Sequence, residues 1–334
     1  MADFVLLISN WYRLNARELP WRSTKNPYFI WLSEVILQQT RVDQGLNYYL
    51  KFIEKYPILS DLANANEASV LKLWQGLGYY SRARNLHKTA QQVRDEYQGE
   101  FPQTYQQIIQ LKGIGPYTAA AISSFAFDLP HAVVDGNVYR VLSRYYGIDE
   151  AIDSGNGKKL FQELADSLIP TADPALFNQA IMEFGAIHCV PNNPDCDNCI
   201  LTSSCASAFN PELIKKRPFK KGKTKVRKRY FHYLHLEKNQ QIALDQRTGK
   251  DVWEKLYEFP LIESESESVP AVFKDSASLC YQTKHILSHQ HIYAYFYKST
   301  ETEFNGLKFV FTNKKDLHDY PIHRLMEKYL ESNE

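Results

Sequence analysis

The sequence predicts a multidomain protein of the α plus α+β class, in which an all-α domain is followed by a smaller α+β domain. Over residues 4–209 the apolar side chains mostly recur at helical spacing, and prolines mark short connections between helices. After residue 230 the pattern changes to alternating, aromatic-rich runs, which are typical of strands. Because the chain has 334 residues and 44% hydrophobic content, it is long enough to bury two cores.

The elements of the α+β part follow from this alternation. The Ser- and Glu-rich run 263–268 is expected to be an exposed loop. The expected strands cover residues 230–236, 241–244, 293–297 and 307–311, and a C-terminal helix covers residues 322–330.

A basic segment joins the two parts. Residues 214–230, IKKRPFKKGKTKVRKRY, contain ten Lys or Arg and no acidic residue, although the net charge of the chain is only +1. Such a run fits either a solvated linker or a contact with nucleic-acid phosphates, and the charge pattern alone leaves both readings open.

Four of the five cysteines, Cys189, Cys196, Cys199 and Cys205, lie close together in the pattern C-x6-C-x2-C-x5-C. Four thiolates at this spacing can enclose one metal centre, either zinc or an iron–sulfur cluster. Zinc sites usually pair two short knuckles across a longer spacer, whereas here one short knuckle lies between two wider steps. The spacing therefore favours iron–sulfur. A nucleic-acid deaminase is excluded, because the H-x-E triplet that it requires upstream occurs only downstream, at 235–237.

Two further motifs suggest contact with a polyanion and a catalytic acid. In LKGIGPYT (111–118), Gly113 and Gly115 separate two helical patterns, so the backbone can approach a phosphate at a helix N-terminus. An ordinary helix–helix turn with a glycine cap has the same composition. In VVDGNVYR (133–140), Asp135 stands just before an expected helix, where it fits either a structural N-cap or a catalytic carboxylate.

Together with the cysteine spacing, these motifs resemble the helix-hairpin-helix glycosylases of the endonuclease III superfamily. The resemblance implies a DNA glycosylase domain with a [4Fe-4S] cluster loop, and it places the essential aspartate at Asp135, facing the sugar C1′ of a flipped nucleotide. A fixed negative charge there would stabilise an oxocarbenium-like state. The implied domains are residues 1–213 for the glycosylase, 214–229 for the linker and 230–334 for the last domain. Within the glycosylase domain, a six-helix subdomain spans about 23–130, and residues 1–22 with 131–213 form an iron–sulfur subdomain.

Glu34 is an isolated acid in a strongly apolar run, WLSEVIL (31–37). Burial there should raise its pKa and keep a proton available near neutrality, although an Arg-paired structural glutamate is the alternative. The segments LPWR (19–22) and WLSEVILQQTRV (31–42) resemble those of the MutY adenine glycosylases. The resemblance implies that Glu34 is the general acid that protonates N7 of adenine.

Glycosylases of this superfamily either hydrolyse the glycosidic bond directly or attack it with a lysine nucleophile. The position of that lysine is occupied here by Tyr117. Bifunctional members carry a lysine nucleophile there, so Schiff-base chemistry is not expected. Lys112 lies nearby and is interpreted as a phosphate contact or a surface residue. A bifunctional or pyrimidine-mismatch glycosylase is one alternative, and a non-catalytic DNA-damage or redox sensor is another.

The resemblance carries over further residues, each with an implied role. Adenine would be bound by Trp21, Arg22 and Gln179, whose amide can pair with the N6/N7 edge of adenine. Tyr117 and Asn137 would assist Asp135. The opposite base, 8-oxoguanine, would be read by Gln38, Gln39 and Tyr79, with Arg82 and the hairpin glycines Gly113 and Gly115 on the DNA backbone.

The last domain resembles the Nudix-like domain with which MutY enzymes recognise 8-oxoguanine. The resemblance rests on VWEKLYEFP (252–260) and on Leu287-Ser288-His289, where many relatives have phenylalanine before Ser-His. Ser288 and His289 would contact 8-oxoguanine. The Nudix catalytic box is missing from the sequence, so pyrophosphate hydrolysis is not expected.

The function implied is that of a monofunctional hydrolase of base excision repair, which removes adenine mispaired with 8-oxoguanine or guanine. The expected partner is double-stranded DNA, with contacts to repair or replication proteins through the linker, and the expected state is a monomer. The N-terminus shows no export signal or organelle extension, and no stretch reaches membrane-spanning length. We therefore expect a bacterial cytoplasmic, nucleoid-associated protein with no membrane partner.

Overall fold

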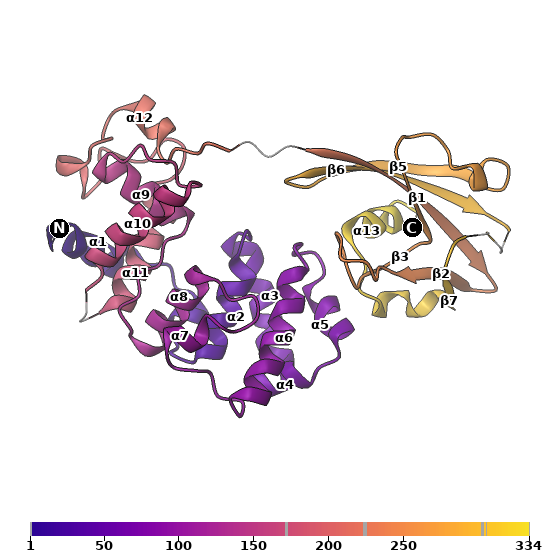
Figure 1. Cartoon of the computed structure of the whole chain (residues 1–334), viewed down its shortest axis with the longest axis horizontal. Helices are drawn as coiled ribbons and strands as arrows, with labels where there is room; N and C mark the ends of the chain where they lie inside the picture. The colour runs from indigo at the N-terminus through magenta and orange to yellow at the C-terminus, as the bar shows by residue number, and fades with distance from the viewer. Residues whose placement is uncertain (1, 171–172, 223–225, 302–303, 305, 334) are drawn as a thin grey trace. The chain divides into compact units, whose positions relative to one another are not determined.

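The computed structural model describes residues 2–170, 173–222, 226–301, 304 and 306–333. Within these ranges the chain forms two compact units, residues 1–63 with 88–222 and residues 64–87 with 223–334 (Figure 1). The second unit thus includes residues 64–87, which the sequence patterns place with the helical domain. None of the helices in the described ranges is both long and apolar enough to cross a lipid bilayer.

The first unit is helical. Helix α2 packs against both α3 and α8 (Figure 1). Its elements are α1 (Ala2–Asn15), η1 (Pro20–Arg22), α2 (Pro27–Leu37), α3 (Val42–Lys55), α4 (Leu59–Asn64), most of α6 (Ser81–Glu96), α7 (Tyr105–Ile108), α8 (Pro116–Phe127), α9 (Gly136–Tyr146), α10 (Gly155–Leu168), α11 (Pro174–Glu183), η2 (Phe184–His188), η3 (Thr202–Ser204) and α12 (Pro211–Lys216).

Capping residues explain where several of these helices begin. Asn26 precedes α2 and accepts a hydrogen bond from the amide of Tyr28. Asp135 precedes α9 and accepts from the amides of Asn137 and Val138. These side chains satisfy N–H groups that have no partner within a helix. The expected helix start after Asp135 is therefore confirmed.

The second unit combines a mixed sheet with helices. Its elements are α5 (Glu67–Trp74), β1 (Arg227–Lys238), β2 (Gln241–Gln246), β3 (Tyr257–Glu258), β4 (Leu261–Ser264), η4 (Ala271–Phe273), β5 (Ser278–Ile286), β6 (Gln290–Ser299), β7 (Val310–Asn313), η5 (Lys314–Asp319) and α13 (Arg324–Glu331). The strand order is β3-β2-β1-β6-β5, with β4 paired to β1 and β7 paired to β2. β1 and β6 run parallel, while β5 runs antiparallel to β6.

The strand predictions were right for the buried strands and wrong at the periphery. β1, β2 and β6 coincide with expected strands, and α13 coincides with the expected C-terminal helix. β5 was missed because it lies at the end of the sheet. Its side chains are exposed or half-buried there, and its sequence is largely polar. The predicted loop 263–268 overlaps β4, and the strand expected over 307–311 begins only at Val310. β1 also begins at Arg227, within the predicted linker.

Candidate active site

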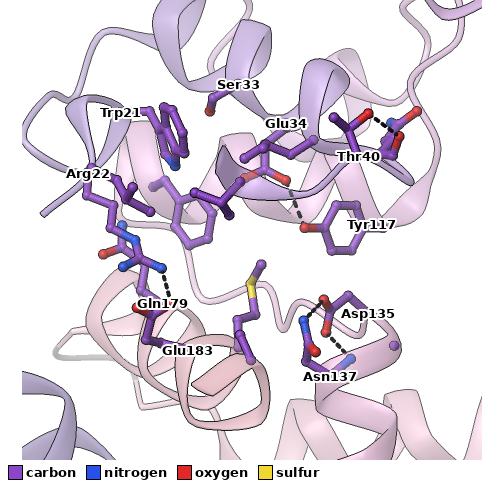
Figure 2. A pocket seen from close by; sticks show the side chains of 18 of the residues that line it. Trp21, Arg22, Ser33, Glu34, Thr40, Tyr117, Asp135, Asn137, Gln179 and Glu183 are labelled. Carbon is purple, nitrogen blue, oxygen red and sulfur yellow. Dashed lines mark hydrogen bonds and ion pairs between the residues drawn. The ribbon is translucent and has the colours of Figure 1, made fainter. Parts of the chain in front are cut away.

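A cavity of about 590 Å³ opens in the helical unit between α2, α8, α9 and α11 (Figure 2). Its walls include every residue that the sequence assigned to chemistry and to adenine, together with Gln38 and Gln39, which were assigned to the opposite base. These predicted residues are Trp21, Arg22, Glu34, Gln38, Gln39, Tyr117, Asp135, Asn137 and Gln179. The fold therefore brings together segments that are up to about 160 residues apart in the chain.

Glu34 is 7% exposed and lies on α2, in the apolar run that predicted its burial. Its Oε2 accepts a hydrogen bond of 2.8 Å from the hydroxyl of Tyr117 on α8. Burial raises the pKa of Glu34 to about 7, which the hydrogen bond from Tyr117 opposes, while the negative charge of Asp135 adds to the rise. Such a carboxyl group holds a proton near neutral pH and can release it.

Asp135 faces Glu34 from the N-terminus of α9, where Figure 2 shows it beside Asn137 across the cavity from Glu34 and Tyr117. Its Oδ1 accepts from the amides of Asn137 and Val138, and its Oδ2 accepts from the Asn137 side chain. Burial raises the pKa of Asp135, and these hydrogen bonds oppose the rise. The helix N-terminus also favours the charged form. The cavity thus holds two acids in different environments.

Glu183 is a further acid in the wall that the sequence analysis missed. Its side chain is 1% exposed and accepts from Arg17 and from Arg22, each at 2.7 Å. Burial alone would raise the pKa of Glu183, but the hydrogen bonds from Arg17 and then Arg22 lower it to about 2. In the described part of the chain, the arginine-paired glutamate of this cavity is therefore Glu183, whereas Glu34 pairs with Tyr117. Gln179 and Glu183 lie four residues apart on α11, a spacing that could have revealed Glu183.

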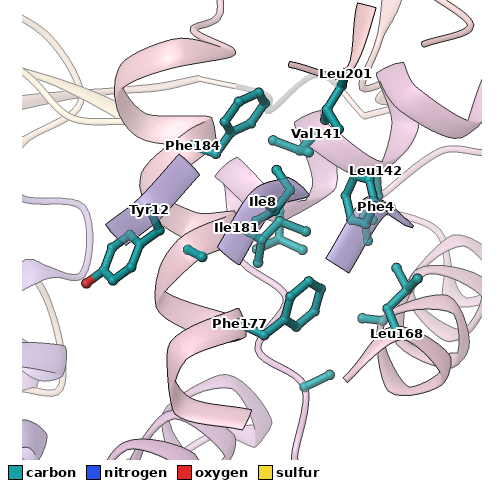
Figure 3. Close-up of a cluster of buried hydrophobic side chains, with 14 of the residues drawn as sticks. Phe4, Ile8, Tyr12, Val141, Leu142, Leu168, Phe177, Ile181, Phe184 and Leu201 are labelled. Carbon is teal, nitrogen blue, oxygen red and sulfur yellow. The ribbon is translucent and has the colours of Figure 1, made fainter. Parts of the chain in front are cut away.

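An apolar cluster behind the cavity fixes α1, α9 and α11 against one another (Figure 3). Phe4 and Ile8 of α1, Val141 and Leu142 of α9, and Phe177 and Ile181 of α11 are all nearly inaccessible to solvent. Asn178, which is 1% exposed, adds polar contacts: it accepts from the amide of Val133 and donates to Ser124 and His131. These bonds hold the segment that leads into Asp135.

Arg140 connects the start of α9 to the cysteine loop. Its guanidinium donates to Asn137 Oδ1 and to the carbonyl oxygens of Gly185 and Cys189. Gly185 lets η2 pack closely against the start of α9, because a Cβ atom at this position would lie only 2.7 Å from Cβ of Asn137. The sequence analysis did not identify Arg140, since two of its partners, Gly185 and Cys189, lie more than forty residues away along the chain.

The four clustered cysteines line one small pocket together with Val141 and Arg144. A guanidinium N–H of Arg144 lies 3.5 Å from Cys189 Sγ, and the amide of Leu201 donates to Cys199 Sγ at 3.4 Å. In the described ranges, no three His, Cys, Asp or Glu side chains are close enough together to ligate one metal ion.

Three residues predicted to contact the DNA backbone, Gly113, Gly115 and Arg82, do not line the cavity. Gly113 has φ +74°, a backbone conformation that favours glycine, and Gly115 is the N-cap of α8. Arg82 is 9% exposed; it donates to the carbonyl of Gly78, and burial lowers its pKa to about 10. This placement favours a role in holding the 76–80 turn.

Tyr79, Ser288 and His289 all belong to the second unit. Tyr79 is 48% exposed, and its hydroxyl lies 3.1 Å from the hydroxyl of Ser288. Ser288 and His289 are both exposed, while Leu287 is half-buried. The unit therefore presents a tyrosine, a serine and a histidine at its surface.

Comparisons with known proteins agree with this fold. The pattern of the HhH-GPD superfamily of base excision DNA repair proteins matches residues 32–168, and that of the NUDIX domain matches residues 232–332. The adenine DNA glycosylase of Buchnera aphidicola subsp. Baizongia pistaciae is 38% identical over 296 residues, which cover 87% of this chain and 84% of the relative. The adenine DNA glycosylase of Homo sapiens is 43% identical over 205 residues, or 59% of this chain and 38% of the relative.

Two solved structures are similar to the helical part. A thermostable thymine-DNA glycosylase is 32% identical, with a TM-score of 0.56 over 61% of this chain and 94% of that one. Endonuclease III in a trapped covalent intermediate with DNA is 23% identical, with a TM-score of 0.54 over 61% of this chain and 93% of that one, and supports the fold. By sequence and fold, the chain belongs to the adenine DNA glycosylases, hydrolases of base excision repair that cleave the N-glycosidic bond of a base in DNA.

Proposed function

We propose that the protein removes adenine mispaired with 8-oxoguanine or guanine, by hydrolysis and without a lysine nucleophile. The observation that carries this proposal is the cavity in which Glu34, with a pKa of about 7, faces Asp135. A protonated acid and a carboxylate on opposite sides of one cavity are what cleavage of a purine N-glycosidic bond requires.

In the proposed reaction, Glu34 donates its proton to N7 of a flipped adenine, so that the base leaves as a neutral molecule. Positive charge then develops on the sugar, and Asp135 stabilises it or traps it transiently at C1′. Water completes the abasic site. Tyr117 supports the carboxylate form of Glu34 through its hydrogen bond, and Asn137 orients Asp135.

Recognition of adenine is assigned to Trp21, Arg22 and Gln179, which line the same cavity. Trp21 is 8% exposed and offers an apolar surface, and Arg22 is held by Glu183. Because N7 receives the proton from Glu34, the amide oxygen of Gln179 is assigned to the exocyclic amino group of adenine. Amide side chains suit this base, since they offer a donor and an acceptor side by side.

Recognition of the opposite base is assigned to Gln38, Gln39, Tyr79, Ser288 and His289. Gln39 is exposed and has φ +56°, which projects it from the end of α2 in an uncommon conformation. A strained, exposed side chain at the rim of the cavity suits insertion into a duplex. At Leu287, an aliphatic side chain replaces a ring that would stack on a base, and it reduces stacking by about 1 kcal/mol or more.

Contact with the DNA backbone is assigned to the hairpin glycines Gly113 and Gly115. The positive φ of Gly113 and the helix N-terminus that follows Gly115 suit contact with a phosphate. The basic run 214–230 provides a second attraction for DNA through its charge. Arg82 is also assigned to the DNA backbone, although its burial makes it the weakest of these assignments.

A [4Fe-4S] cluster is assigned to Cys189, Cys196, Cys199 and Cys205. The all-thiol donor set and the hydrogen bonds to sulfur from Arg144 and Leu201 fit such a cluster. A cluster of four irons is larger than a single ion, so its ligands need not approach one another closely. Bound there, it would supply electron-transfer chemistry and cross-link the loop, and no step of the glycosylase reaction passes through it.

The test uses duplexes that carry adenine opposite 8-oxoguanine, adenine opposite guanine, or thymine opposite guanine. Alkali cleavage after incubation should reveal abasic sites in the first two duplexes, and borohydride should trap no protein on them. Excision of thymine alone would favour a pyrimidine-mismatch enzyme, a class suggested by the similarity to a thymine-DNA glycosylase. Efficient borohydride trapping would favour a bifunctional enzyme instead.

A further inference from the structure

Tyr12 lies on α1, directly behind the wall of the cavity. Its ring is 7% exposed and belongs to the apolar cluster of the helical unit, while Figure 3 shows its hydroxyl directed away from the other labelled side chains. That hydroxyl donates a hydrogen bond of 2.8 Å to Oε1 of Gln179. Gln179 lines the cavity, whereas Tyr12 does not.

The surroundings of Tyr12 make its hydroxyl a donor. The guanidinium of Arg22 lies 5.6 Å from the centre of the ring and is itself held by Glu183. Burial raises the pKa of Tyr12, which keeps the hydroxyl protonated. A positive charge near the ring makes a phenol a better donor and a poorer acceptor.

This hydrogen bond determines which way round the Gln179 amide lies, and therefore where its acceptor Oε1 and its donor Nε2 are placed. In the described part of the chain, the Tyr12 hydroxyl is the partner of the Gln179 side chain. With Oε1 bound to Tyr12, Nε2 is fixed as the donor end of the amide, and Oε1 keeps one lone pair for a ligand. A rotation of the amide by 180° would place an NH2 group against the hydroxyl, which would then have to accept, and the buried proton of Tyr12 would lose its acceptor.

We propose that Tyr12 is a specificity-determining positioning residue, which fixes the Gln179 amide in the orientation that accepts 6-amino purines and rejects 6-oxo purines. The proposal rests on the assignment of Gln179 to the base in the proposed function. Adenine has an amino donor at C6 beside the ring acceptor N1, which matches the fixed amide. Hypoxanthine has an oxygen acceptor at C6 beside the N1–H donor, which matches only the rotated amide.

The experiment measures single-turnover release of adenine and of hypoxanthine, each placed opposite 8-oxoguanine in the same duplex. In Tyr12→Phe the ring and its packing remain and the hydroxyl is lost, so the ratio of adenine to hypoxanthine release should fall about tenfold. The matched control is Tyr28→Phe, which removes another buried hydroxyl that donates to a backbone carbonyl, that of Tyr56, at 2.7 Å. Its ratio should equal that of the wild type.

A second pair of variants separates positioning from a general structural role. In a Gln179→Ala background the amide is gone, so adding Tyr12→Phe should change the ratio no further. An unchanged ratio in Tyr12→Phe, or an equal change with and without Gln179, would overturn the inference alone. Failure of the wild-type protein to release adenine at all would contradict the proposed function and this inference with it.

Discussion

The hydroxyl of Tyr117 and the carboxyl group of Glu34 form a hydrogen bond of 2.8 Å inside the cavity. Burial favours the neutral acid, whereas this bond favours the carboxylate, and the balance leaves the pKa of Glu34 at about 7. The acid is therefore protonated in a large fraction of molecules at neutral pH, and its conjugate base is stabilised once the proton has left.

The pH dependence of adenine release should report this bond. In the proposed reaction the protonated form of Glu34 is the active one, so the rate should fall as pH rises through about 7. Tyr117→Phe removes the bond that favours the carboxylate, so the fall should move to higher pH. Single-turnover rates measured across the pH range test this, with Tyr28→Phe as the control, and a fall at unchanged or lower pH in Tyr117→Phe would contradict it.

Glu34 and Glu183 should affect stability in opposite directions. The pKa of Glu34 is raised from 4.5 to about 7, so its ionisation destabilises the fold as pH rises above 4.5. Glu34→Gln should therefore raise the free energy of unfolding at pH 8 by about 3 kcal/mol, since one pKa unit corresponds to about 1.4 kcal/mol, and should change it little at pH 4.

The pKa of Glu183 is lowered from 4.5 to about 2. Its stabilising contribution to the free energy of unfolding is therefore present above pH 4.5 and is lost as the pH falls toward 2. Glu183→Gln should lower the free energy of unfolding at pH 8 by about 2–3 kcal/mol. Urea unfolding at pH 4 and pH 8 measures both effects. Equal signs for the two variants at pH 8 would contradict the assigned environments.

Asp135 caps α9, and the proposed reaction also assigns it a catalytic role. A second capping aspartate, Asp173, allows the two roles to be distinguished. Asp135→Asn keeps a capping side chain but removes the charge, so the rate should fall by about a thousandfold or more while DNA binding persists. Asp173, the N-cap of α11, accepts from the amide of Leu176, and Asp173→Asn should leave the rate unchanged. A rate within tenfold of the wild type in Asp135→Asn would remove its catalytic assignment.

Asn178 should matter for the stability of the segment before Asp135. Its three hydrogen bonds, of which those to Val133 and Ser124 are buried and that to His131 is partly buried, are lost in Asn178→Ala. The free energy of unfolding should fall by about 3 kcal/mol, because each lost bond leaves a buried polar group unpaired. The control is Asn15→Ala, which loses one bond at an exposed position and should cost under about 1 kcal/mol. Equal losses in the two variants would contradict this account.

The sequence identified those parts of the site that depend on local patterns. Glu34 was singled out because a single acid in an apolar helix is expected to be buried. Asp135 was singled out from the resemblance of its motif, since its position before a helix fits an N-cap equally well. The four cysteines were found from their spacing. In each of these cases, the physical cause lies within about twenty residues of the chain.

The parts that were missed depend on contacts between distant segments. Glu183 is recognisable as an ion-paired acid only when Arg17, 166 residues earlier, is brought beside it. Tyr12 looks like an ordinary core aromatic until its hydroxyl is seen to meet Gln179, 167 residues later. β5 escaped prediction because an exposed strand at the end of a sheet lacks the apolar face that reveals a buried one.

The most direct test of the account is the release of adenine by Glu34→Gln from a duplex with adenine opposite 8-oxoguanine, under single-turnover conditions at pH 7. Glutamine retains the shape of the side chain and can still accept from Tyr117, but it has no proton to give to N7. The account predicts a rate at least about a hundredfold below that of the wild type, in a protein that is folded and binds the duplex. A rate within twofold of the wild type would show that Glu34 is not the general acid.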